Sequence, residues 1–251
     1  DSGVEKIVPD SATVDRALEW LAHADASKPW ALYINLQAGH FPYTLEDDAQ
    51  RPWLPDTPTW STFSYLGFPK SEKDLVVNRY DNALHYADSQ IGRLRSYLDK
   101  VGKLDDTMWI LTSDHGEMFF EKGLVTHGKT LYEIEARVPL IMVWPKHIAP
   151  DRRDEPVSHL DILPTVFDYL GLQPHPSWQG RSFRSADPDG VGKHAIFMNI
   201  QGLRFADAIV CWPYKLILER TTKKAYLFDL AHDAHENVNL IKDEVETAAQ
   251  L

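Results

Sequence analysis

The chain has 251 residues, 43% of them hydrophobic, so it is long enough to bury a substantial core. Its 37 acidic and 26 basic residues give a formal net charge of −11, and no basic stripe is present, which argues against a nucleic-acid partner. The single cysteine, Cys211, excludes an internal disulfide. No apolar run is long enough to span a bilayer, and the acidic start at 1–5 is no signal peptide, so any membrane anchor upstream stays unknown.

The first elements alternate between helix and strand. Asp10 or Ser11 is expected to cap a helix whose apolar residues recur at helical spacing. The apolar run at 30–36 predicts a buried strand, which delivers His40 at its C-terminal end. A proline-rich, aromatic loop follows at 41–69, and its part from Trp53 to Phe68 either contacts a sugar or aryl group of a substrate or packs internally.

A long helix is predicted next. Ser71, with Asp74 three residues later, forms a capping pattern. The predicted buried stripe advances by threes and fours: Val76, Tyr80, Leu84, Ala87, Ile91, Leu94, Leu98 and Val101.

A short apolar segment then leads directly into polar residues. Residues 107–112 predict a strand, and Asp114, His115 and Gly116 follow it. Open α/β sheets place their chemistry at the C-terminal ends of strands. On a loop leaving the strand, adjacent side chains can both turn toward one cation, and glycine permits a sharp exit. Asp114 and His115 are therefore candidate metal ligands.

The remaining elements suggest a second, smaller part of the chain. A strand is expected at 138–143, a helix near 160–170 and a loop at 174–178. Shorter strand-like runs at 194–199, 207–211, 214–219 and 224–229 predict a small, mostly antiparallel sheet, and a terminal helix is expected from about Lys242. The predicted division is 1–178 for the larger α/β portion and 179–251 for a small C-terminal subdomain.

Several motifs, in their order along the chain, resemble those of the sulfatases of the alkaline phosphatase superfamily. Gly-His-Phe-Pro-Tyr at 39–43 is similar to their H-x-P loop, and residues 86–94 resemble the helix before their metal-binding strand. The Asp-His-Gly-Glu run at 114–117 and His-Gly-Lys at 127–129 follow. Further matches in family order occur at 161–165, 180–183, 227–230 and 237–240.

The resemblance implies an α/β fold, an alkaline phosphatase-like sandwich with a mostly parallel sheet plus the small antiparallel sheet. It implies metal-dependent hydrolysis of a small-molecule or glycan sulfate ester, in a periplasmic or extracytoplasmic location. Asp114 and His115 would hold a divalent metal ion, and His40 and Lys129 would contact the oxygens of the anion. His127 would act at the metal or at the substrate. Calcium is the first expectation by family, with manganese, magnesium or zinc as alternatives because an imidazole favours softer ions.

Two features of such enzymes do not occur in this sequence. Family members carry an aspartate pair and a Cys-x-Pro-Ser-Arg nucleophile motif near their N-terminus, whereas Cys211 lies in Val-Cys-Trp-Pro-Tyr. We therefore expect the chain to be the C-terminal half of an enzyme, inactive alone and prone to self-association through an exposed sheet. Histidine at 115 leaves open a phosphonate or phosphodiester hydrolase or a phosphoethanolamine transferase. A non-catalytic binding module is the remaining alternative.

Overall fold

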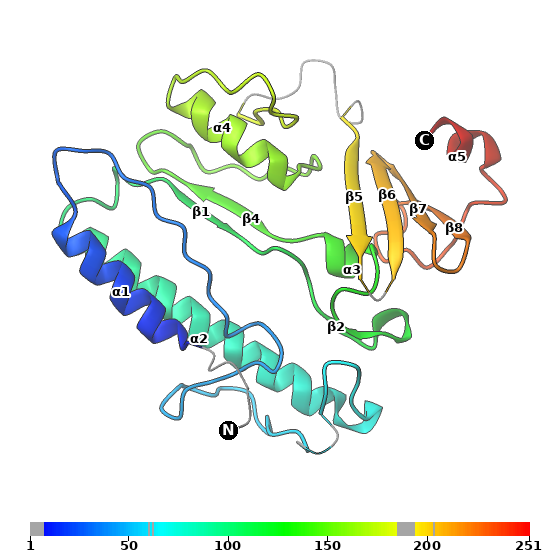
Figure 1. The fold of residues 1–251 in the computed structure, drawn as a ribbon, viewed down its shortest axis with the longest axis horizontal. Helices are drawn as coiled ribbons and strands as arrows, with labels where there is room; N and C mark the ends of the chain where they lie inside the picture. The colour runs from blue at the N-terminus through cyan, green and yellow to red at the C-terminus, as the bar shows by residue number, and fades with distance from the viewer. Residues whose placement is uncertain (1–7, 60, 62, 185–193, 203) are drawn as a thin grey trace. The chain divides into compact units, whose positions relative to one another are not determined.

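A computed structural model of the chain describes residues 8–59, 61, 63–184, 194–202 and 204–251 (Figure 1). The start at 1–5 lies outside this part. Contacts between residues divide the chain into two units. The first unit comprises Asp1–Ser113, Glu117–Thr126 and Pro139–Ala149, and the second comprises Asp114–Gly116, His127–Val138 and Pro150–Leu251. A domain boundary at 178 stays a prediction.

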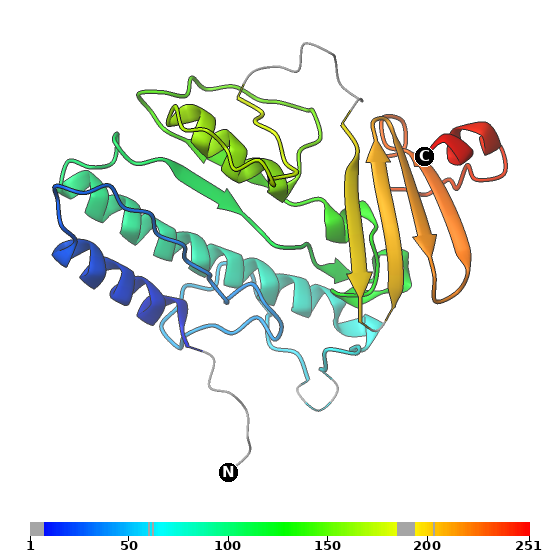
Figure 2. The ribbon, with the colours of Figure 1, turned by 45° about the horizontal axis from the view of Figure 1, so that its top comes forward.

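Helices α1 (Asp10–His23) and α2 (Lys73–Lys100) of the first unit confirm two predicted helices, and they lie side by side (Figures 1 and 2). Asp10 is the first helical residue rather than a cap. Its carboxylate accepts hydrogen bonds from the backbone N–H groups of Gln37, at 2.6 Å, and Ala38, at 3.1 Å. The carboxylate at the start of α1 thus fixes the segment that leads to His40.

The predicted start and buried stripe of α2 were partly wrong. A 3₁₀ turn, Lys70–Glu72, precedes the helix, and no side chain caps it. Leu84 is 44% exposed, whereas Arg79 and Asn82 are buried. Arg79 donates to the Pro42 carbonyl and Asn82 to the Trp53 carbonyl. The loop over α2 needs donors for its backbone oxygens, so these two polar side chains, which lie outside the predicted apolar stripe, are buried as well.

The strand expectations in this unit need correction. Segment 30–36 is extended but mostly exposed, and it pairs with no strand in the described residues. Strands β1 (Trp109–Thr112) and β4 (Leu140–Val143) form where predicted, but they pair with each other antiparallel. All strand pairs in the described ranges are antiparallel. The described residues therefore do not form the mostly parallel sheet that the resemblance implied, because no described segment supplies a parallel neighbour.

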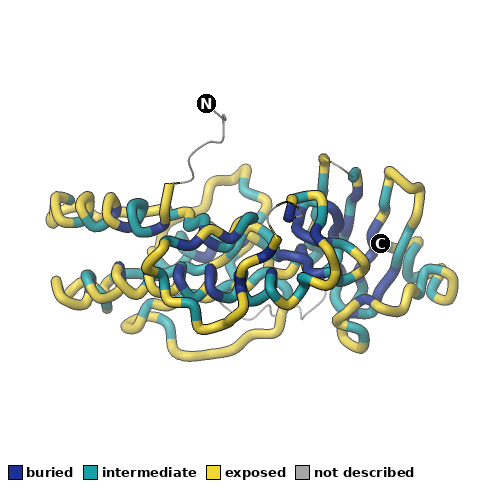
Figure 3. The backbone as a smooth tube through the Cα atoms, turned by 90° about the horizontal axis from the view of Figure 1, so that it is seen from below, coloured by how far each residue is buried: buried dark blue, intermediate teal, exposed yellow. Residues whose placement is uncertain are grey.

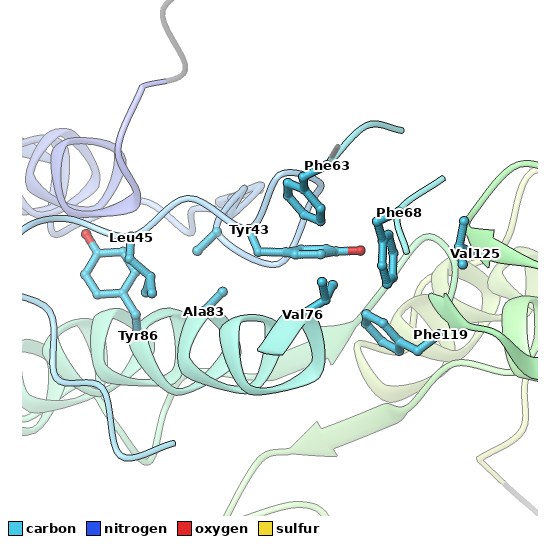
Figure 4. Packing of buried hydrophobic residues seen from close by; sticks show 10 residues of the cluster. Tyr43, Leu45, Phe63, Phe68, Val76, Ala83, Tyr86, Phe119 and Val125 are labelled. Atoms are coloured by element: carbon cyan, nitrogen blue, oxygen red, sulfur yellow. The ribbon is translucent and has the colours of Figure 1, made fainter. Parts of the chain in front are cut away.

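Burial is uneven along the chain, and buried apolar residues gather in separate clusters (Figure 3). In the first unit, Tyr43 is fully buried among aromatic rings (Figure 4). Its ring centroid lies 5.3 Å from that of Tyr80 and 6.3 Å from that of Phe63. Phe68 joins the same cluster. This part of the aromatic loop therefore packs internally. The cluster also contacts the short hairpin of β2 (Met118–Phe119) and β3 (Val125–Thr126), which was not predicted.

The second unit contains the four-stranded antiparallel sheet (Figure 2). Its strands follow chain order: β5 (Ile196–Gln201), β6 (Phe205–Cys211), β7 (Tyr214–Glu219) and β8 (Lys224–Asp229). Helix α4 (Ile162–Tyr169) confirms the predicted helix, and α5 (Val245–Gln250) starts slightly later than expected. The short helix α3 (Glu133–Ala136) was not predicted.

One face of this sheet packs on the segment before α3. Leu131 is buried with Ala206, Ile217 and Phe228, and Tyr132 packs against the same cluster. The Tyr132 ring lies 5.8 Å from that of Phe228. Burial, with a smaller effect from neighbouring Tyr226, raises the pKa of Tyr132 to about 12. The hydroxyl therefore stays protonated at pH values where an exposed tyrosine ionises.

This shift predicts a loss of stability at alkaline pH. In the unfolded chain the Tyr132 phenol ionises near pH 10, so between about pH 10 and 12 the folded state binds more protons and the free energy of unfolding falls as pH rises. This contribution to the free energy of unfolding is fully present below about pH 10; two pKa units correspond to about 3 kcal/mol, which the partial exposure of Tyr132 to solvent reduces to about 2 kcal/mol. Tyr132→Phe should flatten this part of the pH dependence in urea unfolding. An unchanged slope would contradict the assignment to Tyr132.

Candidate active site

The predicted metal ligands lie on the loop that follows β1, in the second unit. The Asp114 side chain is 87% exposed and that of His115 is 35% exposed. The His115 backbone N–H donates to Asp114 Oδ1 at 3.1 Å, and His115 Nε2 lies 3.7 Å from Asp114 Oδ2. The carboxylate and the imidazole therefore turn toward each other, as expected for a loop and not for a continuing strand.

Another predicted site residue lies directly against this pair. The rings of His115 and His127 are stacked, with centroids 4.1 Å apart and planes inclined by 27°. His127 is 8% exposed, so it is a buried partner for the His115 ring. Residues twelve positions apart in the sequence thus share one place, and Asp114, His115 and His127 form one cluster.

Lys129 lies on the same segment, 127–132, and its position depends on a buried carboxylate. Glu135, in α3, is 4% exposed. It accepts hydrogen bonds from the backbone N–H groups of Gly128, Lys129 and Thr130, the last two at 3.2 Å. Burial raises the pKa of Glu135, and these three hydrogen bonds oppose that effect by stabilising the carboxylate. The bend that carries His127 and Lys129 is therefore held by hydrogen bonds to the buried Glu135 side chain.

Helix α3 also holds the loop with Asp114 and His115. The Gly116 N–H donates to the Glu135 carbonyl at 2.8 Å. A Cβ atom on residue 116 would lie 2.2 Å from the Ile134 carbonyl oxygen, so only glycine fits there. The residue expected to provide a sharp turn therefore has a second function, which is close approach to a neighbouring backbone. Both candidate loops are anchored on the same four-residue helix.

His40 belongs to the first unit and is placed by its own loop. It is exposed, its ring Nδ1 lies 2.7 Å from the Phe41 carbonyl, and its carbonyl accepts from the Tyr43 N–H at 2.7 Å. Tyr43, in the aromatic core, thus fixes the turn. That His40 shares a cleft with Asp114 and Lys129 stays a prediction.

The carboxylate of Asp114 and the imidazole of His115 are suitable ligands for a divalent cation, together with further ligands from elsewhere. His115 Nδ1 lies 2.9 Å from the Gly116 carbonyl, an arrangement that directs the Nε2 lone pair outward when Nδ1 carries the proton. In the described part of the chain, no group of three or more histidine, cysteine, aspartate or glutamate residues is placed to bind a metal ion. Asp114 and His115 alone would thus supply an incomplete set of ligands.

Glu135 was missed by sequence reasoning, and so was its partner on α3, Glu133. A glutamate in a polar segment is usually solvated, and nothing in the local pattern marks either residue as buried. The signal is tertiary, because the amides that Glu135 accepts from are brought round by the bend at Gly128, where φ is +74°.

Comparison with known proteins identifies the family. Residues 4–172 match the family model described as Sulfatase, and residues 119–251 match one described as N-sulphoglucosamine sulphohydrolase, C-terminal. Arylsulfatase K of Mus musculus is 26% identical over 96% of this chain and 52% of that protein. The uncharacterized sulfatase YidJ of Escherichia coli is 29% identical over 91% of the chain and 50% of that protein.

Solved structures show the same fold. The phosphonate monoester hydrolase of Agrobacterium radiobacter gives a TM-score of 0.76 at 21% identity, over 99% of this chain and 60% of that one. A protein crystallised with its substrate D-Glucosamine-2-N, 6-O-disulfate gives 0.72 at 20% identity, over 98% of this chain and 68% of that one.

The fold is thus the α/β fold of the alkaline phosphatase superfamily, with a four-stranded antiparallel sheet in its C-terminal part. The chain belongs to the sulfatase family, as the resemblance implied. It spans about half the length of the curated relatives that it matches.

The contact between Gly116 and α3 yields a matched pair of substitutions. Gly116→Ala forces the 114–116 loop and α3 apart, and we expect it to lower the free energy of unfolding by about 1–3 kcal/mol. Gly92→Ala, in α2, meets no atom within 4 Å and should instead stabilise by up to about 1 kcal/mol. Urea unfolding of both variants checks this. Equal stability of the two would show that the close approach has no energetic weight.

Proposed function

We propose that this chain is part of a sulfuric ester hydrolase and carries the portion of its active site that binds the tetrahedral anion. The observation that carries the proposal is that the loops of His115 and Lys129 converge on α3 in a chain that belongs to the sulfatase family.

Each residue has a role in this proposal. The Lys129 ammonium stabilises negative charge on the oxygens of the sulfate group as the ester bond breaks. His40 contacts the same group or protonates the departing alcohol. His127 is held flat against His115, which orients that imidazole toward the metal ion or the substrate. Glu135 keeps the segment of Lys129 in one conformation before the substrate arrives.

Asp114 and His115 would hold a divalent metal ion. Such an ion supplies charge that neutralises the anion and lowers the pKa of a bound nucleophile. Calcium is proposed first by family, and manganese, magnesium or zinc are the alternatives that the imidazole favours. Substrate is proposed to be a small-molecule or glycan sulfate ester, and the location periplasmic or extracytoplasmic.

The attacking group is proposed to lie in sequence upstream of this chain. The chain has a single cysteine, Cys211, which is the last residue of β6 and is partly exposed. It lacks the family's nucleophile motif. The isolated chain should therefore hydrolyse nothing, whereas a longer polypeptide that includes the nucleophile should be active. A phosphonate or phosphodiester hydrolase is the second candidate, because the fold matches that of a phosphonate monoester hydrolase.

Activity assays test the assignment. We expect the longer polypeptide to hydrolyse aryl sulfate with added divalent metal, and Lys129→Met to reduce kcat/KM by about 100-fold because one interaction with the transition-state charge is lost. Lys100→Met, at the exposed end of α2, is the control and should have no effect. Asp114→Asn should raise the metal concentration needed. Faster turnover of a phosphonate ester would favour the second candidate, and turnover by the isolated chain would disprove the missing nucleophile.

Self-association of the isolated chain is also proposed. In the first unit, Tyr33 is 90% exposed, Ile141 is 52% exposed and Val143 is 42% exposed. Exposed apolar side chains on an extended segment and on a strand favour contact with another copy. Sedimentation velocity should detect association that weakens in an Ile141→Glu variant. A monomer at all concentrations would rule it out.

A further inference from the structure

A fully buried lysine lies next to the start of α3, the helix that follows the segment carrying Lys129. Lys215, on β7, is 0% exposed. Its Nζ atom lies 2.7 Å from Glu133 Oε1 and 3.0 Å from Glu236 Oε1. An ammonium group removed from water needs such partners, because an isolated buried charge carries a large desolvation penalty. The sheet thus holds a positive charge where α3 begins.

The second carboxylate also binds the backbone of α3. Glu236, whose side chain is 1% exposed, accepts from the Glu133 N–H at 2.6 Å. Burial raises the pKa of Glu236, and the neighbouring Lys215 ammonium opposes this shift. Glu236 itself has a left-handed backbone, with φ of +54°, so its placement has a conformational cost. These contacts fix the first residue of α3 from two sides.

The same helix carries the contacts that shape the candidate site. Glu133 is bound to the sheet, and two residues later Glu135 binds the amides of Gly128, Lys129 and Thr130. The Glu135 carbonyl accepts from Gly116. A continuous series of hydrogen bonds and ion pairs therefore runs from β7 through α3 to both loops.

We propose that Lys215, Glu133 and Glu236 are positioning residues, which set the conformation of segment 127–132 and thereby the placement of His127 and Lys129. The positioning concerns the chain itself, and only its effect on catalysis rests on the proposed function. None of the three residues is assigned contact with the substrate. The four-stranded sheet, on this view, is a support for the anion-binding segment.

The variants are chosen to distinguish a loss of folding from a displacement of segment 127–132. Lys215→Met leaves the buried Glu236 carboxylate and the partly exposed Glu133 carboxylate without their cation and can unfold the unit. The double variant Lys215→Met with Glu236→Leu removes the two fully buried charges and keeps their volume apolar, and the Glu133 carboxylate that remains is partly exposed, so the fold should persist. Lys224→Met, at an exposed position of neighbouring β8, is the control for removal of a lysine from the sheet.

Hydrogen exchange of the chain, followed by mass spectrometry, gives the direct test. In the double variant we expect the amides of 128–130 to exchange about tenfold faster, while the amides of β6 keep their protection. The control should leave both regions unchanged. If the 128–130 amides keep their protection, or if loop and strand amides lose protection equally, the three residues have a structural role only and the proposal is wrong.

Kinetics of the longer polypeptide give a second readout. The double variant should lower kcat for aryl sulfate about tenfold or more with little change in KM, because a displaced Lys129 loses contacts made with transition-state charge. Glu236→Gln, which keeps an acceptor for the Glu133 N–H, should retain more activity. Unchanged kcat with a mobile segment would overturn the catalytic consequence. If wild type itself hydrolyses no sulfate ester, the proposed function fails, and the exchange result still decides the positioning.

Discussion

The arrangement of the candidate site depends on one buried carboxylate that collects successive backbone amides. Glu135 accepts from three adjacent N–H groups, and this interaction turns segment 127–132 into a defined bend. Backbone amides in a row normally form a site for an external anion. Here the Glu135 carboxylate of the same chain takes the place of such an anion, so these backbone N–H groups already have their hydrogen-bond acceptor.

The buried charges of the second unit differ in how they are paired. The chain has a net charge of −11, yet a site for sulfate must attract an anion. Lys129 is 9% exposed, and its backbone N–H donates to the Glu135 carboxylate. Lys215, by contrast, forms ion pairs with two carboxylates, which neutralise its charge inside the protein. The proposed role of Lys129 in binding the anion thus differs from that of Lys215, whose charge is paired inside the protein.

Much of the fold was predictable because it is local. The periodicity of α1 and the alternation along β6 to β8 depend on residues close in sequence, and both were predicted well. The failures were tertiary. Nothing local shows that Asp10 binds a distant loop, or that segment 30–36 has no described strand beside it. Periodicity also treats Asn82 as a surface residue, although it binds the loop above α2.

For the site, the sequence predicted which residues could bind a metal ion or an anion, but not the buried glutamates that hold their segments in place. Asp114, His115, His127 and Lys129 were recognisable as residue types that bind metals and anions, and three of them lie close together. Their role in binding stays a prediction. Glu133, Glu135 and Glu236 were invisible beforehand because a glutamate in an acidic, polar chain is typical of a solvated surface.

The division of the chain into units has a consequence for how it can be taken apart. The path passes between the units five times, at 113/114, 116/117, 126/127, 138/139 and 149/150. A single proteolytic cut or truncation therefore cannot release either unit whole. Every candidate ligand except His40 lies on a short excursion whose two ends belong to the other unit. To transfer this site to another protein, both units would have to be moved together, because the segments that carry the candidate ligands begin and end in the other unit.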